Sequence, residues 1–292
     1  MSSLNDLLPL LHPFYCSDKI RVGSDYDGGY VLPLTAIKDA DLLLSFGIAT
    51  NIDFEKHIAR LNSDIKIMMF DPFTGPLEDF SRLMNKRFDR APVVERVPAP
   101  QINPGYFEGK KSLPGRILER TYFWTMFYAM LLQKRYTYKK RGLRDYNDRK
   151  FINFPLLFSD PAVNNKNNIL IKMDIELDEY KVWKQLQPYL SKVSLIIVEI
   201  HQVGTFYKDV IQMIGEFKAS GLYVVHVHGN NVDHLIEGSL IPNCLELTFC
   251  KEEYCSPLIP DTRKYPDKDL DAPCNPNWLD YELPVSGLDG DT

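Results

Sequence analysis

The chain has 292 residues, of which 45% are hydrophobic and 25% charged, and its formal net charge is -5. This composition is that of an ordinary globular protein, and the acidic balance argues against a nucleic-acid partner. A chain of this length can bury a large core, so it needs neither disulfides nor a structural metal to fold.

The cysteines and the N-terminal residues bear on the compartment. Five cysteines form no C-x-x-C pair, and an odd number cannot all pair within one chain, so we expect reduced, mostly buried thiols. The first residues lack the basic stretch and the small-residue cleavage site of a secretory signal. No segment reaches the roughly 18 apolar residues of a membrane span. We therefore expect a cytoplasmic protein with no membrane span.

Taken in chain order, short apolar runs alternate with segments of helical periodicity. The runs that predict strands are residues 41–47, 65–71, 92–97, 168–174, 193–200 and 222–228. Apolar residues at i, i+3, i+4 spacing predict helices at residues 52–62, 76–87, 178–190 and 205–219. This alternation, with strands that are apolar along most of their length, predicts a doubly wound parallel sheet covered on both faces.

Three segments depart from the alternation. Residues 244–250 form a further apolar run after a loop without a crossover helix, which predicts an antiparallel last strand. Residues 98–150 begin with a proline-rich loop and continue as an aromatic-rich helical stretch, which predicts a helical cap inserted in the domain. Residues 257–292 indicate an extended tail. The predicted fold is one Rossmann-like α/β domain over residues 1–292, with a seven-stranded, mostly parallel sheet.

The first candidate site residues follow the first strand of this sheet. Ser45 and Gly47 end the strand, and a glycine there lets the backbone approach a ligand closely. The helix that starts near Asp53 and Phe54 would point its N-terminal amides at the same place. The second and third glycines of the dinucleotide fingerprint are absent, which disfavours a nicotinamide cofactor. A plain turn is the alternative interpretation.

The second candidate is Asp71, which closes the next strand. A carboxylate at this position can accept hydrogen bonds from both hydroxyls of a ribose, which is how adenosine cofactors are fixed in such folds. The alternative interpretation is a helix N-cap.

Acidic and histidine side chains end two later strands. Asp174 ends one of them, and Glu199 and His201 stand two apart at the end of the next, so both point to one face. Neighbouring strands would bring the three together, where they could hold a divalent ion such as Mg²⁺ or Mn²⁺ or supply a general base. Hydrogen-bonded polar groups without a catalytic role are the alternative.

Two further features are candidates for the acceptor side. His226 and His228 share a strand face before a Gly-Asn-Asn turn, and we favour His228 because it lies nearer the strand end. Residues 134–150 are rich in lysine, arginine and tyrosine, and could grip an anionic acceptor such as a phosphorylated or nucleotide-linked sugar. A solvated helix face is the alternative interpretation of this basic segment.

Several sequence pieces occur along residues 20–250 in an order known from one family. They are RVG before DGGYV, then LLLSFGIATNIDFEKHI, MMFDP, LIKMDIELDEYKVW, LIIVEIH, and VHVHGNN before PNCLELTF. In these pieces the chain resembles the FkbM-like, DGGY-containing branch of class I S-adenosylmethionine-dependent methyltransferases. The resemblance implies the doubly wound fold, S-adenosylmethionine as the cofactor, and methylation of hydroxyl groups, often on sugars.

The resemblance also implies roles for individual residues. Gly47 would mark the cofactor loop and Asp71 the ribose contact. The turn beside the methionine end of the cofactor would be formed by Asp27, Gly28, Gly29 and Tyr30.

Related sugar O-methyltransferases hold a magnesium ion with acids at the ends of the fourth and fifth strands. Those positions correspond here to Asp174 and to Glu199 or His201. The family usually has glycine where this chain has Leu177, which weakens what the resemblance implies about the acceptor.

The leading hypothesis is an O-methyltransferase for a hydroxyl of a sugar or a similar small acceptor, with Asp174, His201 and His228 as the candidate catalytic residues. The alternative is a catalytically silent binding or scaffold domain of the same fold, which Leu177 favours. A nicotinamide oxidoreductase is a third, disfavoured hypothesis. A homo-oligomer is compatible with the sequence.

Overall fold

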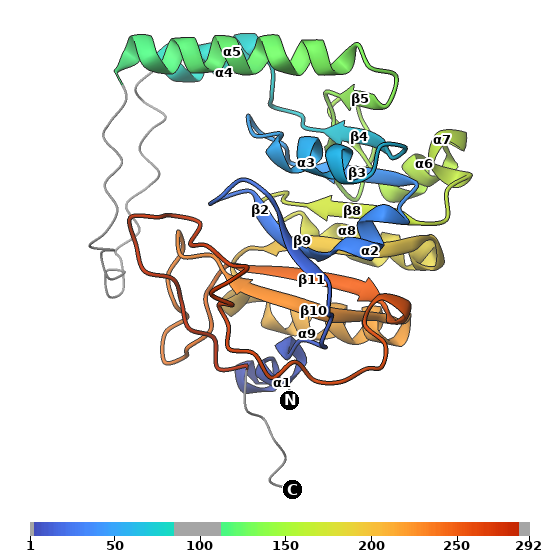
Figure 1. Ribbon diagram of the computed structural model, residues 1–292, viewed down its shortest axis with the longest axis vertical. Helices are drawn as coiled ribbons and strands as arrows, with labels where there is room; N and C mark the ends of the chain where they lie inside the picture. Colours follow the sequence, from blue (N-terminus) through green and yellow to red (C-terminus); the bar gives the residue numbers. More distant parts are fainter. Residues whose placement is uncertain (1–2, 85–111, 286–292) are drawn as a thin grey trace, which may run out of the picture.

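A seven-stranded sheet forms the centre of the molecule. The computed structural model describes residues 3–84 and 112–285 (Figure 1). The strand order is β10-β11-β9-β8-β3-β4-β5. In chain order the strands are β3 (Leu42–Phe46), β4 (Lys66–Phe70), β5 (Tyr136–Lys139), β8 (Ile169–Met173), β9 (Val193–Ile200), β10 (Leu222–Gly229) and β11 (Leu245–Lys251). The predicted Rossmann-like sheet is confirmed, because only β11 runs antiparallel to its neighbours.

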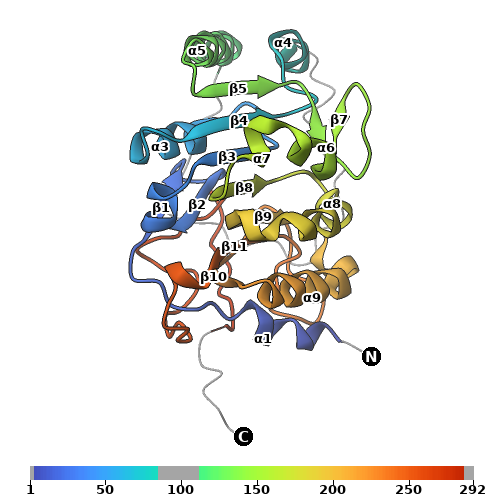
Figure 2. The same cartoon turned by 90° about the vertical axis from the view of Figure 1, so that its right-hand side faces the viewer.

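Helices cover both faces of the sheet (Figure 2). Successive strand residues point to opposite faces, so Leu42 and Leu44 join one hydrophobic core and Leu43 joins the other. Trp183 and Phe217 fill the first core, and Ile58 belongs to the second. The predicted helices correspond to α3 (Asp53–Leu61), α4 (Pro76–Met84), α8 (Glu179–Leu186) and α9 (Val203–Ala219), with the 3-10 helix η2 (Gln187–Lys192) after α8.

The segment predicted as a helical cap also supplies a strand. Residues 98–111 of it, and the strand predicted at 92–97, lie outside the described residues. The remainder begins with α5 (Leu113–Leu131), which packs on α4, and then forms β5 at the edge of the sheet. Because residues 136–138 are β-branched or aromatic, they favour a strand over a helix. The chain is therefore helical up to Leu131 and then rejoins the sheet.

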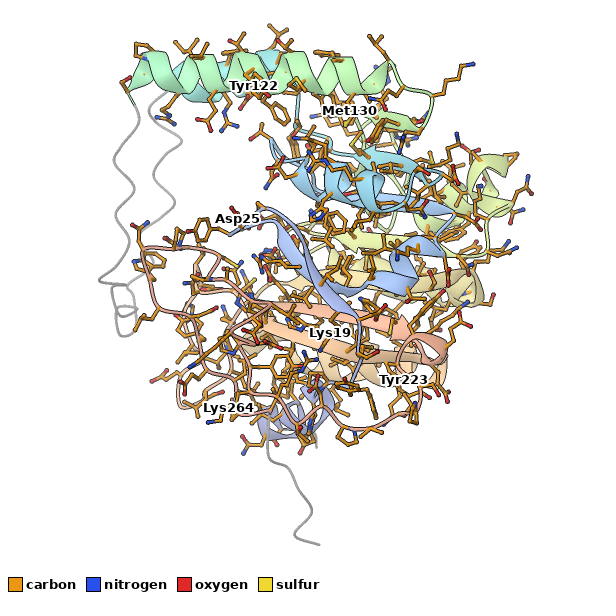
Figure 3. The ribbon with its side chains drawn as sticks, viewed as in Figure 1. Lys19, Asp25, Tyr122, Met130, Tyr223 and Lys264 are labelled. Atoms are coloured by element: carbon orange, nitrogen blue, oxygen red, sulfur yellow. The ribbon has the colours of Figure 1, made fainter. Side chains whose placement is uncertain are left out.

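Short elements connect β5 to β8. They are β6 (Gly142–Leu143), β7 (Phe151–Ile152), α6 (Phe154–Ser159) and α7 (Pro161–Asn164). Tyr122 lies on the part of α5 that extends past the sheet, and 67% of it is exposed (Figure 3).

A hairpin that was not among the predicted strands crosses one face of the sheet. It consists of β1 (Lys19–Gly23) and β2 (Gly29–Pro33), and β2 contacts β10 and β11 (Figure 1). In the chain, the short helices η1 (Leu4–Asp6) and α1 (Leu8–Leu11) precede the hairpin, and α2 (Leu34–Lys38) follows it. The Asp-Gly-Gly-Tyr piece, residues 27–30, covers the end of the hairpin turn and the start of β2.

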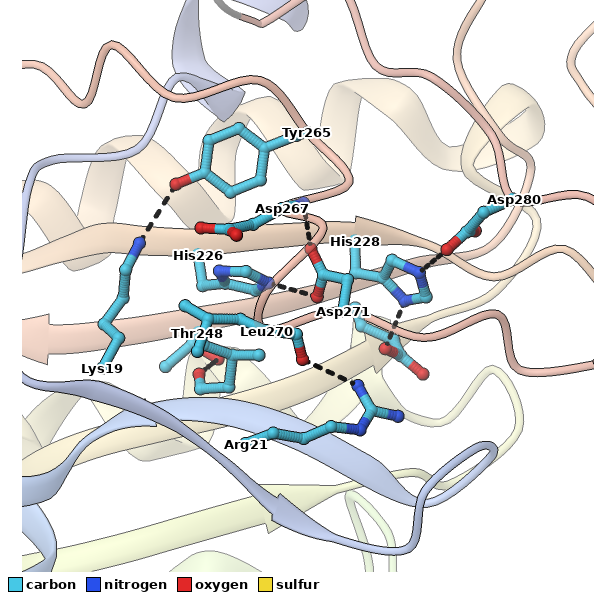
Figure 4. A network of polar contacts seen from close by, with 12 residues as sticks. Lys19, Arg21, His226, His228, Thr248, Tyr265, Asp267, Leu270, Asp271 and Asp280 are labelled. Atoms are coloured by element: carbon cyan, nitrogen blue, oxygen red, sulfur yellow. Dashed lines mark hydrogen bonds and ion pairs between the residues drawn. The ribbon is translucent and has the colours of Figure 1, made fainter.

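Within residues 257–285 the C-terminal tail contains no regular strand or long helix. It follows the 3-10 helix η3 (Glu252–Tyr254). One isolated bridge joins it to the N-terminal segment, from Pro260 to Phe14, and another joins two parts of the tail, Tyr265 and Leu283. Buried polar contacts add to this anchoring, among them a hydrogen bond from Lys19 to Tyr265 (Figure 4).

The expectations about thiols and the membrane can be compared with this fold. All five cysteines are free and buried, as predicted. None of the helices within residues 3–84 and 112–285 combines the length and the apolarity that crossing a bilayer requires.

Candidate functional site

Two adjoining cavities lie at the carboxyl ends of β3, β4 and β8. The larger, of about 150 Å³, is lined by Gly47, Asp71, Pro72, Phe73, Gly142, Leu143, Arg144, Phe151, Asp174, Ile175, Glu176 and Asp178. The smaller, of about 80 Å³, is lined by Asp27, Gly28, Tyr30, Gly47, Ile48, Ala49, Asn51, Phe54, Glu55, Lys172 and Asp174. Gly47 and Asp174 line both cavities, so the two meet where β3 and β8 end.

Gly47 is required by the neighbouring backbone. Its φ is +74°, and a Cβ atom there would lie 1.7 Å from the carbonyl oxygen of Asp174. A glycine therefore lets the ends of β3 and β8 come into contact. Lys172 secures this junction, because its Nζ donates to the Gly47 carbonyl at 3.1 Å and lies 3.8 Å from Asp174 Oδ2.

Asp71 lines the larger cavity and also orders two loops. Its Oδ2 accepts from the Ala49 amide at 3.0 Å, and its Oδ1 accepts from the Phe73 amide at 2.8 Å. Helix α4 begins only at Pro76, so Asp71 closes a turn and does not cap that helix. A carboxylate has about four acceptor sites, so both oxygens can still receive hydrogen bonds from a ligand. The ribose contact stays a prediction.

Two polar side chains that line the smaller cavity have an atom without a hydrogen-bond partner. Tyr30 Oη and Glu55 Oε2 are buried and have no hydrogen-bond partner among the described residues. The other oxygen of Glu55 accepts from Ser45 Oγ. Burial raises the pKa of the Glu55 carboxyl, and burial together with nearby carboxylates raises the pKa of the Tyr30 hydroxyl. Unpaired buried polar atoms are costly, so a polar ligand group is the natural partner for them.

The Asp-Gly-Gly-Tyr turn and the loop after β3 are joined at this cavity. Asn51 donates from Nδ2 to the Asp27 carbonyl at 3.3 Å. Phe54 packs edge-on against Tyr30, with ring centroids 5.5 Å apart. Burial raises the pKa of Asp27, which lines the cavity with Gly28.

Three of the predicted cofactor residues, Gly29, Ser45 and Asp53, line neither cavity. Asp53 forms a surface ion pair with Lys56 at 2.9 Å. Gly29 lies against the Ser24 carbonyl and the Arg21 side chain, where a Cβ atom would not fit.

His201 lies among carboxylates, and the metal-ligand roles predicted for His201, Asp174 and Glu199 stay predictions. Its Nε2 is 3.6 Å from Glu199 Oε1 and 3.7 Å from Glu176 Oε2. Ligand atoms of Asp174, Glu176 and His201 all lie within 4.8 Å of one another. On the other side of the ring, Nδ1 is 3.2 Å from Glu179 Oε1, which also accepts from the His201 amide at 2.9 Å.

The charges in this cluster shift its ionisation. Burial lowers the pKa of His201, but the hydrogen bond to Glu179 and the charge of Glu199 outweigh it and raise the pKa to about 9. Burial, followed by the charges of Asp174 and Glu246, raises the pKa of Glu199 to about 8. A cation placed among these groups would relieve the repulsion between them.

The donor set fits a divalent ion. Carboxylate oxygens with one imidazole nitrogen suit Mg²⁺ or Mn²⁺. Glu179 fixes the His201 ring through Nδ1 and leaves Nε2 to face Glu176 and Glu199, which is the usual outer support of a metal-bound histidine.

His228 lies apart from both cavities. Its Nδ1 is 2.9 Å from Glu246 Oε2 and its Nε2 is 2.9 Å from Asp280 Oδ2, so both ring nitrogens have carboxylate partners (Figure 4). His226 has one carboxylate partner, because its Nε2 lies 2.8 Å from Asp271 Oδ1. These contacts tie the C-terminal tail to β10. The structure does not bring His228 to Asp174, and its predicted catalytic role gains no support from its position.

The basic segment reaches the larger cavity through Arg144. Its guanidinium carbon is 4.0 Å from the centre of the Phe151 ring, and its Nε is 2.7 Å from Asp178 Oδ2. Lys140 pairs with Glu78 on the surface. The segment is a strand followed by loops, so the helix-face interpretation does not describe it.

Backbone strain is concentrated at the same edge of the sheet. Within the described residues, the non-glycine residues with positive φ are Ala49, Glu176, Leu177 and Gln202. They follow β3, β8 and β9, and such strain clusters at functional sites. Leu177 has a φ of +79°, a left-handed backbone that glycine adopts more readily than leucine.

Sequence reasoning missed several residues of the site. Glu176 stands two residues after Asp174, and a second acid so close to a strand end is a signal that could have found it. Lys172 interrupts an apolar strand, which is also a usable signal. Glu55 and Glu179 lie on helices, and only the packing of those helices brings them to the site.

No protein-family model and no curated protein matches the chain. Among solved structures, it is similar to precorrin-6y C5,15-methyltransferase of Geobacter metallireducens, with 9% identity and a TM-score of 0.33 over 74% of this chain and 84% of that one. The Methanococcus jannaschii fibrillarin pre-rRNA processing protein matches at 9% identity and a TM-score of 0.36, over 74% and 69% of the chains. The M. jannaschii TYW2 protein, solved with AdoMet, matches at 7% identity and a TM-score of 0.29, over 81% and 89%. At these TM-scores we draw no functional conclusion from the matches.

Proposed function

We propose that the protein is an S-adenosylmethionine-dependent methyltransferase. The observation that carries the proposal is the pair of cavities that meet at Gly47 and Asp174. The larger combines aromatic and aliphatic walls with the carboxylate of Asp71, which suits an adenosine. The smaller combines the ammonium group of Lys172 with the unpartnered oxygens of Tyr30 and Glu55, which suits the charged amino-acid end of the cofactor. The family resemblance of the sequence supports the same assignment.

Binding would require a local rearrangement at the junction. The cavities, of about 150 and 80 Å³, are smaller than the roughly 300 Å³ at which ligand pockets usually begin. Lys172 lines the smaller cavity and is held by the Gly47 carbonyl and Asp174, the two residues that line both cavities. We expect this side chain to move when a ligand joins the two cavities.

The acceptor in this proposal is a hydroxyl group, on a sugar or a similar small molecule. S-adenosylmethionine would supply an electrophilic methyl group, which the acceptor oxygen would take in line while the bond to the sulfonium sulfur breaks and leaves a neutral thioether. The residues of the site mainly position the two reactants. The hydroxyl proton leaves to the carboxylate of Asp174, which lines both cavities.

A divalent ion is a further part of the proposal. Asp174, Glu176 and His201 would hold it, and when bound it lowers the pKa of a hydroxyl that it coordinates. Arg144 beside Phe151 is the group of the basic segment placed to contact an acceptor or the adenine. The alternative, a catalytically silent domain of the same fold, rests on Leu177, whose left-handed backbone is a conformation that glycine adopts more readily.

Asp71→Asn and Asp71→Ala test the adenosine assignment. We expect the affinity for S-adenosylmethionine, measured by isothermal titration calorimetry, to fall at least tenfold, or about 1.4 kcal/mol, because the ribose loses an acceptor. Asp64→Asn, at an exposed acid after α3, is the matched control and should bind as the unchanged protein does. Thermal unfolding of each variant checks that the fold survives. Equal affinity in all the variants would sink the ribose assignment.

A further inference from the structure

Three buried thiols from separate parts of the chain meet away from the candidate site. Cys16 lies in the loop before β1, Cys250 on β11, and Cys255 directly after η3. Their sulfur atoms all lie within 4.8 Å of one another, and the residues are 3%, 0% and 2% exposed. None of the three lines either of the two cavities. We call this set the thiol cluster.

Backbone carbonyls beside the thiol cluster orient two of its sulfur atoms. Cys16 Sγ donates to the Tyr254 carbonyl at 3.2 Å, and Cys255 Sγ lies 3.7 Å from the Lys251 carbonyl.

The number and type of ligands select the ion. Thiolates prefer soft ions, chiefly Cu(I) and Zn²⁺. Structural zinc takes four protein ligands in a tetrahedron, whereas no fourth His, Cys, Asp or Glu atom of the described residues joins the three sulfurs. We propose that Cys16, Cys250 and Cys255 form a three-sulfur binding site for one Cu(I) ion.

Such a site would link three elements that are distant in sequence. Cu(I) would replace the thiol protons of Cys16, Cys250 and Cys255, which are released on binding. The ion would join the N-terminal loop to the end of β11 and to η3. It should therefore stabilise the folded chain without touching the methyl-transfer site.

The test uses the reduced, full-length protein under anaerobic conditions, with Cu(I) supplied from a colorimetric chelator of known affinity. We expect about one Cu(I) per chain, seen by native mass spectrometry, together with a near-ultraviolet thiolate-to-copper absorption. Cys16→Ser and Cys255→Ser should each lower the affinity at least tenfold. Cys274→Ser removes another buried thiol outside the cluster and is the matched control.

Two measurements keep the proposal falsifiable if a variant unfolds. Cu(I) should raise the unfolding temperature of the unchanged protein and of Cys274→Ser, because it binds only the folded cluster. No copper retained by the unchanged protein, or an equal loss in the Cys274→Ser control, would overturn the site. Tighter retention of Zn²⁺ than of Cu(I), or a disulfide within the cluster in place of bound copper, would overturn it as well.

Discussion

The contact between Gly47 and Asp174 shows how one residue sets the geometry of the whole edge. The Gly47 backbone is left-handed, and the Asp174 carbonyl occupies the space that a side chain would need. Both cavities are built on this contact, and the ends of β3 and β8 lie closer together than any side chain at position 47 would permit.

Gly47→Ala should lower the free energy of unfolding by about 2–5 kcal/mol. A left-handed alanine costs roughly 1–2 kcal/mol, and forcing a methyl group into packed backbone adds roughly 1–3 kcal/mol. Chemical denaturation measures the change. Gly215→Ala is the control, because that glycine lies inside α9 with nothing within 4 Å of its Cβ position. It should gain about 0.5–1 kcal/mol, and a Gly47→Ala protein as stable as that control would contradict the close contact.

Glu179 contacts His201 twice and so controls the orientation of its ring. If His201 is a metal ligand, Glu179→Gln should weaken Mn²⁺ binding by roughly 10- to 100-fold, the usual effect of losing an outer-shell carboxylate. Titration of Mn²⁺ followed by electron paramagnetic resonance measures this. The exposed Glu237→Gln is the control. Unchanged Mn²⁺ affinity in Glu179→Gln would separate Glu179 from any metal function.

At the scale of elements, the C-terminal tail is held by buried charge. Lys19 Nζ donates to the Val225 carbonyl at 2.7 Å and to Asp261 Oδ2 at 3.1 Å, and Arg263 donates to the same carboxylate. Both members of the Lys19–Asp261 pair have side chains only 1% exposed. The tail therefore closes over the hairpin and β10 through a desolvated ion pair.

Asp261→Asn should lower the free energy of unfolding by about 3 kcal/mol at pH 7, because it leaves the buried Lys19 without its partner. Burial opposes ionisation, but Arg263 and Lys19 hold the pKa of Asp261 well below its usual range. The stabilisation is therefore full above roughly pH 4, the unfolded value, and is lost as the pH falls further.

Urea denaturation between pH 3 and pH 8 checks both statements about Asp261. The difference between the two proteins should be constant from neutral pH down to about pH 5 and should shrink below about pH 4. The exposed Asp269→Asn controls for loss of a tail charge. A difference that already shrinks between pH 8 and pH 6 would mean that another group is responsible.

At the scale of the whole molecule, the two cavities depend on segments from across the chain. The hairpin turn, the loops after β3 and β4, the end of β8 and the loops beside β7 all contribute walls. A ligand that occupies both cavities should therefore stabilise the domain as a unit. At a free concentration of 100 times its dissociation constant, it adds about 2.7 kcal/mol.

We expect S-adenosylmethionine and its demethylated product to raise the unfolding temperature, and NAD to leave it unchanged. Differential scanning fluorimetry on the full chain measures all three in one experiment. A shift with NAD and none with S-adenosylmethionine would replace the proposed cofactor with a nicotinamide.

Local patterns were enough to predict the sheet and the positions of its central strands. Strands buried on both faces must be apolar along their length, so β3, β8 and β9 are visible in the sequence, and so are Asp71, Asp174 and His201 at the strand ends. The edge strand β5 was hidden because a half-exposed strand of tyrosine and threonine lacks that signature.

Only the tertiary structure decided which polar groups share a site. Glu55 and Glu179 come from helices and Tyr30 from a hairpin, and their approach to the strand ends depends on packing between elements, which no local spacing encodes. The same reason separates His228, which the tail engages through Asp280, from the cavities, and brings Cys16 beside Cys250 and Cys255. Sequence periodicity reports which face of an element is buried, whereas the partner on that face is settled by the fold of the whole chain.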